Sequence, residues 1–279
     1  IYALLALGLA VVFSIVALIN FAHGELMTVA GYAIFFMLAL ASPLAAAAVI
    51  GVGAAALAAL ATERLAFRPM RKADVTGLLI TSFAVSVILR VIFQNGISAR
   101  PKPIAMPASI TGALDLGFAH VGIIPLISIA TCAVVLFALT RFLKLTVLGT
   151  AMRAAAEDFA VVRLVGIRAN HVVAVAFAVS GVLAGVAAFL WIAQRGSVDP
   201  LMGFVPVLKA FVAAIIGGLG SLSGAVAGGL VLGVLEVMCQ AYLPVSVLPF
   251  RDAFVLGLVI LILIFRPEGL IPAPSVRRS

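Results

Sequence analysis

The sequence predicts an all-α fold: a polytopic transmembrane helical bundle in which some helices are broken or re-entrant. Three observations support this fold class. Of the 279 residues, 65% are hydrophobic and only 10% are charged, too few charges to cover the surface of a soluble domain of this size. Several apolar runs approach or exceed the ~18–20 residues that a helix needs to cross a bilayer. Polar residues or glycine clusters interrupt two of the runs, as expected where a membrane helix is broken.

The apolar runs give the expected membrane segments in order along the chain. Two of them, 206–219 and 252–265, are short for a full span, so we expect half-helices, re-entrant pieces or helices tilted against their neighbours. The approximate segments are 2–19, 25–41, 44–62, 76–93, 121–140, 171–192, 206–219, 222–242 and 252–265.

The basic residues orient these segments. Twelve of the 18 Lys and Arg residues fall on three loops that the order of the segments places on one side. Cytoplasmic loops carry an excess of Lys and Arg, so this side is predicted to be cytoplasmic, with loops 94–120, 194–205 and 243–251 outside. The net charge of +8 is thus a topology signal and does not indicate nucleic-acid binding. The twelve are Arg64, Arg68, Arg71 and Lys72 in loop 63–75, Arg141, Lys144, Arg153, Arg163 and Arg168 in loop 141–170, and Arg266, Arg277 and Arg278 in the tail.

The motifs of an enzyme or metal site are absent from the sequence. No G-x-x-x-x-G-K-[ST] phosphate loop is present, so the chain does not hydrolyse ATP by that route. The three histidines lie far apart and the two cysteines, Cys132 and Cys239, sit in apolar runs, where buried thiols are expected. We therefore expect neither catalytic residues nor a metal or cofactor in this chain. Because the chain begins at Ile1 inside an apolar run, we also expect an N-terminal piece to be missing.

Loop 141–170 is a polar island in an otherwise apolar chain. A helix is predicted to begin at Thr150, a residue that can cap it, and to end at Gly166. Apolar or small residues recur every three or four positions, while Arg153, Glu157 and Arg163 project elsewhere. This pattern indicates a short amphipathic surface helix, which can dock a nucleotide-hydrolysing subunit, lie on lipid headgroups, or be a plain structured loop. The recurring residues are Met152, Ala155, Phe159, Val162 and Gly166.

The first interruption of an apolar run is formed by Asn20, His23, Gly24 and Glu25. These polar side chains are costly against lipid, so they are expected to face protein, water or a membrane surface. Either the helix breaks here and shapes the translocation pathway, or a polar turn joins two spans at the surface. Direct binding of cargo by His23 or Glu25 is the less favoured interpretation, because polar residues at membrane depth often serve packing.

The second interruption is the glycine-rich stretch from Gly217 to Gly224, which includes Gly218, Gly220 and Ser221. Glycine-rich breaks in two separated parts of a transporter indicate a central pathway, so these residues are pathway candidates. Glycines spaced four apart from Gly224 onward also permit close helix packing, and packing alone is the favoured interpretation for them.

The residues of the island carry a specific resemblance. GTAMRAAAEDFAVVRLVGI, at 149–167, is similar to the cytoplasmic coupling segment of ABC importer permeases of the branched-chain amino-acid family. INFAHGE at 19–25, IIGGLGSLSGAVAGG at 215–229 and FRPEGL at 265–270 agree, in the expected order over essentially the whole chain. The match resembles the first of the two related permeases of such importers. The resemblance implies a single permease domain over 1–279, with 141–170 as its cytoplasmic coupling loop.

The resemblance also implies partners and cargo. Two ABC ATPase subunits, carrying ATP and Mg²⁺, would bind inside, an extracytoplasmic substrate-binding protein outside, and a related second permease, or a second copy, in the bacterial inner membrane. The cargo would be leucine, isoleucine, valine or similar apolar amino acids, with urea or short amides as variants. The implied ATPase-coupling residues are Arg153, Ala155, Ala156, Glu157, Asp158, Phe159 and Gly166.

Two other functions fit the residues alone. A secondary transporter or channel that works without an ATPase would need membrane carboxylates, and Glu25 and Glu236 are the candidates. A non-transporting membrane scaffold would need the glycine-rich stretch 217–224 only for stability.

Overall fold

The computed structural model describes residues 1–71, 73–107, 112–115, 120–157, 162, 164 and 166–271, and it consists mainly of long helices. Two pairs of short strands, β1 (Lys102–Pro103) with β4 (Ser197–Val198) and β2 (Ala113–Asp115) with β3 (His120–Gly122), complete the described part. The main helices are α1 (Tyr2–Val16), α2 (His23–Ala39), α3 (Leu44–Thr62), α4 (Val75–Gly96), α6 (Ile123–Leu145), α7 (Val147–Glu157), α9 (Ala169–Arg195), α10 (Phe204–Gly217), α11 (Leu222–Tyr242) and α12 (Arg251–Phe265).

The lengths of the helices confirm a polytopic helical membrane protein. Among the described residues, six helical stretches are long and apolar enough to cross a bilayer. The remaining apolar helices are shorter: α1, α2 and α10, with 15, 17 and 14 residues. The expected short segment 206–219 is therefore confirmed as α10, whereas 252–265 is extended by a 3₁₀ turn at Leu248–Phe250 into a span of 18 residues. The six stretches are Leu44–Phe67, Val75–Gly96, Ile123–Leu145, Ala169–Arg195, Leu222–Tyr242 and Leu248–Phe265.

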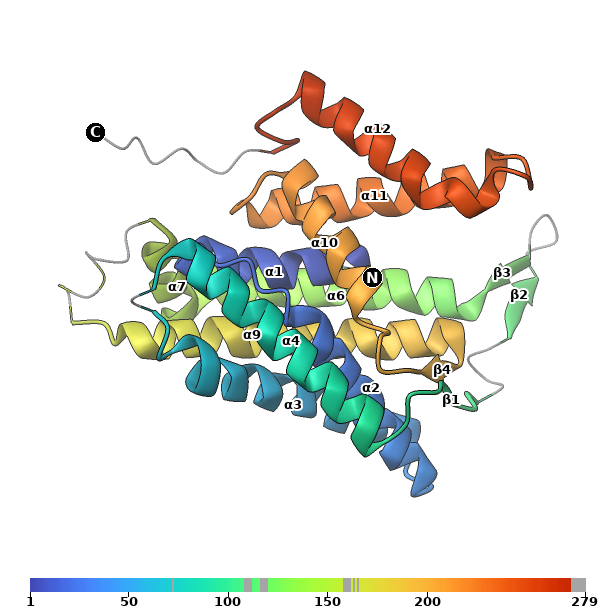
Figure 1. Ribbon diagram of the computed structural model, residues 1–279, viewed down its shortest axis with the longest axis horizontal. Helices are drawn as coiled ribbons and strands as arrows, with labels where there is room; N and C mark the ends of the chain where they lie inside the picture. The colour runs from blue at the N-terminus through green and yellow to red at the C-terminus, as the bar shows by residue number, and fades with distance from the viewer. Residues whose placement is uncertain are drawn as a thin grey trace.

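Helix α1 lies at the centre of the bundle. It packs against α9, α10 and α11, and nearly all of its residues from Ala3 to Val12 are buried. In Figure 1 it runs through the middle of the molecule, with α11 and α12 on one side and α3 on the other. The span α9 is also internal, with 61% of its apolar window buried, whereas 6% of that of α6 and 11% of that of α12 are buried. Helices α6 and α12 therefore present their apolar surfaces outward, as lipid-facing or partner-facing helices do.

Small residues allow the central helices to approach closely, as their four-residue spacing predicts. On α9, a side chain at Gly181 would meet the backbone of Ala55 and Ala56, and one at Gly185 would meet that of Val52. Their lack of a side chain thus sets the α3–α9 contact.

The chain breaks where the sequence predicts, but earlier than expected at the first position. Helix α1 ends at Val16 and not at residue 19, because Ala17 adopts a left-handed conformation with φ 53°. Six residues then connect it to α2, whose first turn at His23 is buried within the protein. At the second break Gly218 and Gly220 have positive φ, of 108° and 86°, a conformation that glycine adopts without strain.

The two ends of the bundle differ in character. We call the end with α7 and the α3–α4 connection (63–74) the basic end, and the end with β1–β4 the strand end; Figure 1 shows them at opposite sides. Pairing of β1 with β4 joins loops 94–120 and 194–205, so these loops share one side, as predicted. At the basic end Arg71 pairs with Glu63 and with Asn170 at the start of α9. The short strands were not predicted, since each depends on a partner strand elsewhere in the chain.

Candidate functional site

A buried polar cluster lies where α2 begins. Asn20, His23 and Glu25 are exposed by only 1%, 0% and 1%. Ser86 Oγ on α4 donates to Glu25 Oε1 at 3.0 Å, and Arg90 Nε donates to the same oxygen at 3.1 Å. A buried carboxylate is tolerated when it is paired and hydrogen-bonded in this way, so the pair holds α2 to α4.

Two other residues of this break, His23 and Gly24, contact neighbouring core helices. His23 Nδ1 lies 2.9 Å from Ser180 Oγ on α9, and its ring fills the space beside Gly8 of α1. Gly24 lies against the backbone of Gly203, at the start of α10, where a side chain would clash. Neither polar side-chain atom of Asn20 has a hydrogen-bond partner among the described residues. The side chains of the break therefore face protein, one of the surroundings expected for them.

The sequence signals that the charge of Arg90 needs a partner but does not identify Glu25 as that partner. Arg90 lies in the apolar run 76–93 and was missed by sequence reasoning. A lone arginine in a membrane segment requires a partner, and Glu25 is the buried acid that supplies it. The guanidinium also lies over the Phe204 ring, 4.3 Å from the centroid, so α4 contacts both α2 and the start of α10.

The glycine-rich stretch forms a tight turn between α10 and α11. Gly217 and Gly224 face each other so closely that a side chain on either would meet the backbone of the other. Ser221 caps α11, its Oγ accepting from the Gly224 N–H at 3.0 Å. The turn is covered by the chain beyond α12, whose Leu270 and Ile271 N–H groups donate to the carbonyls of Ile216 and Gly217 at 2.7 and 3.0 Å.

The two breaks meet at one small apolar cavity. Ile19 from the first break and Leu219 and Gly220 from the second line a space of about 10 Å³. That volume is about one water molecule, so this cavity is too small to hold an amino acid. The polar candidates His23 and Glu25 do not line it.

Helix α7 corrects the boundaries of the predicted surface helix. It begins at Val147, and its cap is Thr146 instead of Thr150, since the Thr146 hydroxyl accepts from the Gly149 N–H at 2.9 Å. The flanking spans are also longer than predicted, so the connection between α6 and α9 covers 146–168 rather than 141–170. Helix α7 ends at Glu157 in the described residues; Gly166 has φ 81° and the Ile167 N–H donates to the Val162 carbonyl, a geometry typical of a helix end at glycine, but most of the predicted helix between Glu157 and Gly166 lies outside the described residues.

The described residues of the predicted surface helix face as the spacing predicts, except that Gly166, expected on the apolar or small face, is exposed. Met152, Ala155 and Val162 are buried, whereas Arg153, Ala156 and Glu157 are exposed; the Ala155 side chain thus points into the bundle and not toward a partner. Helix α7 packs on α6, α9 and α1, and Gly149 sits directly on the backbone of Leu143. Asp158, Phe159 and Arg163 lie outside the described residues.

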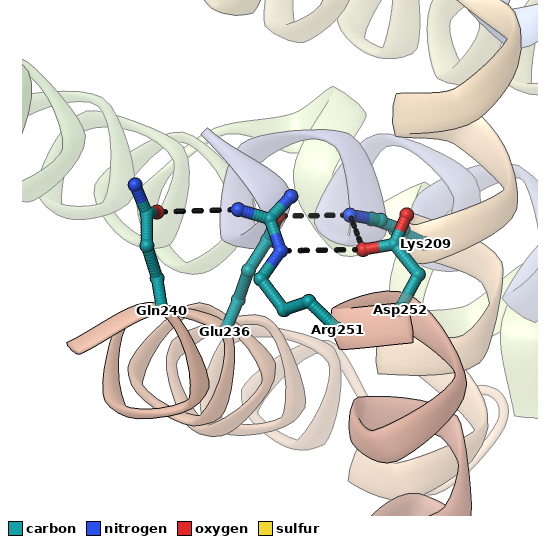
Figure 2. A network of polar contacts seen from close by, with 5 residues as sticks. All are labelled: Lys209, Glu236, Gln240, Arg251 and Asp252. Carbon is teal, nitrogen blue, oxygen red and sulfur yellow. Dashed lines mark hydrogen bonds and ion pairs between the residues drawn. The ribbon is translucent and has the colours of Figure 1, made fainter. Parts of the chain in front are cut away.

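A second charged cluster, at the strand end, was only partly anticipated. Figure 2 shows Lys209 of α10, Glu236 and Gln240 of α11, and Arg251 and Asp252 of α12 joined in one network. Glu236 Oε1 lies 2.9 Å from both Lys209 Nζ and Arg251 Nη2, and Lys209 reaches Asp252 Oδ1 at 3.0 Å. Lys209 was missed, although a lone lysine in the apolar run 206–219 signals a partner. The network ties α10, α11 and α12 together.

Comparison with known proteins gives a consistent result. The family model described as "Branched-chain amino acid transport system / permease component" matches residues 1–264. The permease protein BraD of the high-affinity branched-chain amino acid transport system of Pseudomonas aeruginosa is 34% identical over 99% of this chain and 93% of its own length. Its counterpart LivH of Escherichia coli is 32% identical with the same coverage. LivM of Escherichia coli is 32% identical over 53% of this chain and 33% of its own length. No solved structure gives a significant match.

Proposed function

The chain belongs to the family of branched-chain amino acid transport system permease components, and from this premise we propose how it works. It is a multi-pass membrane permease subunit and not an enzyme. We propose that residues 1–279 form one permease domain of an ATP-driven importer in the bacterial inner membrane. Its cargo is proposed to be branched-chain or similar apolar amino acids, as the names of its relatives indicate.

The proposed assembly has four kinds of subunit. Two ABC ATPase subunits bind the basic end and carry ATP with Mg²⁺, because this chain has no phosphate loop of its own. A related second permease completes the pathway, and the partial similarity to LivM supports that such relatives exist. A substrate-binding protein delivers cargo at the strand end. A pathway shared between two permeases is consistent with the small cavity at the two breaks.

The exposed face of α7 is the observation that carries this proposal. A helix of 11 residues at the basic end buries one face on α6, α9 and α1 and presents Arg153, Ala156 and Glu157 to the outside. Opposite charges flanking a small residue suit a groove on a partner protein, since charges fix orientation and alanine allows close approach. Asp158, Phe159 and Gly166 follow in the proposed coupling segment, and Ala155 supports it from beneath.

The packing of α7 supplies a route for motion. Because α7 contacts α1, an ATPase that pulls on α7 moves the central helix of the bundle. Helix α1 leads directly into the first break, and Ile19 after it shares the small cavity with Gly220 of the second. We propose that Gly24 and the stretch 217–224 are the flexible points at which the pathway changes access.

The alternative of an ion-coupled transporter finds no support in the carboxylates. Glu25 is paired with Arg90, and Glu236 with Lys209 and Arg251. A coupling carboxylate must bind and release an ion, whereas both of these already hold cationic side chains.

Charge reversal on α7 tests the proposal. Arg153→Glu and Glu157→Lys are expected to leave membrane levels unchanged and to weaken co-purification of the ATPases about tenfold or more, since such contacts are worth ~1.4 kcal/mol or above. Transport driven by ATP should fall in parallel. Arg100→Glu, exposed at the strand end, is the matched control and should retain both. Full transport and ATPase recovery in both α7 variants would refute the docking role.

A further inference from the structure

A polar cavity opens at the strand end, apart from the two breaks. Its volume is about 220 Å³, and it lies where α9 ends and where α10 and α12 begin. Ligand pockets for drug-sized molecules are typically ~300–1,000 Å³, so this cavity suits a smaller molecule. The network of Lys209, Glu236, Arg251 and Asp252 forms one wall.

The charges in this cavity fall into two groups. The four residues of the network pair with one another, two cations with two carboxylates, and are neutral together. The two other charged residues of the lining, Arg195 and Asp199, form no ion pair within the described part of the chain. Arg195 is exposed and lies over the Trp191 ring, 4.3 Å from its centroid. One oxygen of Asp199 accepts from the Leu201 N–H at 2.9 Å.

Both of these charged residues lie on one short stretch of the chain and line the same cavity. Arg195 is the last residue of α9, and after Gly196, with φ 65°, the chain enters strand β4 and reaches Asp199. Pairing of β4 with β1 holds this short connection in place. A guanidinium and a carboxylate that form no ion pair within the described residues are therefore presented on one short segment that includes a paired strand.

Apolar surface completes the lining. Trp191, Met202 and Val205 contribute to the same cavity. A ligand that matches all of these features carries an anionic and a cationic group close together and a small apolar side chain. An isolated anion would meet the Asp199 carboxylate and an isolated cation the Arg195 guanidinium, each with an unfavourable charge.

We propose that this cavity receives a free zwitterionic α-amino acid with an apolar side chain, its carboxylate on Arg195 and its ammonium on Asp199. Arginine binds carboxylates through paired N–H donors, and the ammonium is a donor that the second Asp199 oxygen can accept. The apolar side chain then lies against Met202 and Val205. The inference deepens the proposed function and rests on it for the class of cargo; it gives the permease an outer receiving site of its own.

Direct binding to the purified importer complex, without binding protein and without ATP, tests this. Radiolabelled leucine should bind at least tenfold more tightly than 4-methylpentanoate, which lacks the ammonium, or 3-methylbutylamine, which lacks the carboxylate. Arg195→Gln should weaken leucine binding about tenfold or more and should not weaken binding of the amine, because it removes a charge that repels the amine. Asp199→Asn should weaken leucine binding to the same extent and should not weaken binding of the acid. Arg100→Gln is the control, exposed at the same end but outside the cavity.

Other outcomes overturn the proposal. Unchanged leucine binding in Arg195→Gln and Asp199→Asn would remove the site. Displacement of leucine by an equal concentration of phosphoethanolamine would assign it to a lipid headgroup. If the two variants lose only their association with the substrate-binding protein and still bind leucine, the cavity would be a docking surface for that protein. ATP-driven leucine uptake by the wild-type complex, measured in parallel, distinguishes failure of the receiving site from failure of the proposed function. If the wild type takes up leucine but leucine binding is unchanged in both variants, only the receiving site is refuted. If the wild type takes up no leucine, the proposed function is refuted.

Discussion

The ion pair between Glu25 and Arg90 gives the sharpest test of how the buried polar cluster stabilises the bundle. The two partners are not equally buried: the Glu25 side chain is 1% exposed and that of Arg90 19%. Arg90→Met removes the cation and leaves the buried Glu25 carboxylate with only the Ser86 hydroxyl as hydrogen-bond donor to Oε1. Breaking a buried pair in this way costs about 3–5 kcal/mol. Glu25→Gln removes the charge that cannot reach water and keeps an acceptor oxygen, so the cost is that of a charge-assisted hydrogen bond, about 1.5–3 kcal/mol.

The double variant separates pairing from packing. With both charges removed, no carboxylate is left unpaired, so Glu25→Gln/Arg90→Met should be more stable than Arg90→Met alone. For this order the interaction energy of the cycle must exceed the cost of Glu25→Gln alone, so it is expected near the upper end of the usual range, about 3 kcal/mol. Thermal unfolding of the purified protein in one detergent gives the order of the four melting temperatures: wild type, then Glu25→Gln, then the double variant, with Arg90→Met lowest.

Two results would refute this reasoning. Equal losses in the single variants would mean that the difference in burial has no energetic consequence. Additive losses in the double variant would mean that the two side chains do not interact, and that α2 and α4 are held by apolar packing instead.

Three further changes test the packing of the breaks and the outer network. Gly224→Leu places a side chain against the backbone of the facing turn and should lower the free energy of unfolding by about 1–3 kcal/mol or more. Gly233→Leu, in open space on the same helix, is the control and should lower it little. Equal melting temperatures of the two variants would contradict the packing role. Gly8→Ala should also lower the melting temperature, because the new Cβ lies 2.6 Å from a His23 ring carbon. Adding His23→Ala to this variant should restore part of the loss. If it restores none, the His23 ring is not the group with which the new Cβ clashes. Lys209→Met leaves two carboxylates of α11 and α12 to share one arginine, so unfolding should require about 1–3 kcal/mol less, and an unchanged melting temperature would refute a stabilising network.

The sequence was sufficient for the course of the chain through the bundle. Each expected membrane segment corresponds to a helix, because an apolar run of spanning length has no stable alternative to a helix in lipid. The amphipathic spacing of α7 likewise predicted which residues face in and which face out. What spacing alone misplaced was the helix start: Thr146 and Thr150 are both competent caps, and the end of α6 at Leu145 decides between them.

The site was predicted less completely, since its residues are separated along the chain. Asn20, His23, Glu25 and the glycine-rich stretch stand out because polar and flexible residues are conspicuous in apolar surroundings. Their partners were not apparent: Ser180 lies 157 residues from His23, and Arg90 lies 65 from Glu25. No periodicity encodes distances of that kind.

By itself, the sequence determined that this protein is a membrane-embedded helical bundle with two interrupted segments, one charged surface helix and a basic side, because hydrophobicity and helical period act locally. Only the tertiary structure decided what each interruption contacts. It buried the first break against α4 and α9, closed the second by backbone contact between Gly217 and Gly224, and joined the charges of α10, α11 and α12. The physical reason is that a charged or polar group in an apolar core is stabilised by a complementary group beside it, and folding of the whole chain determines which complement is near.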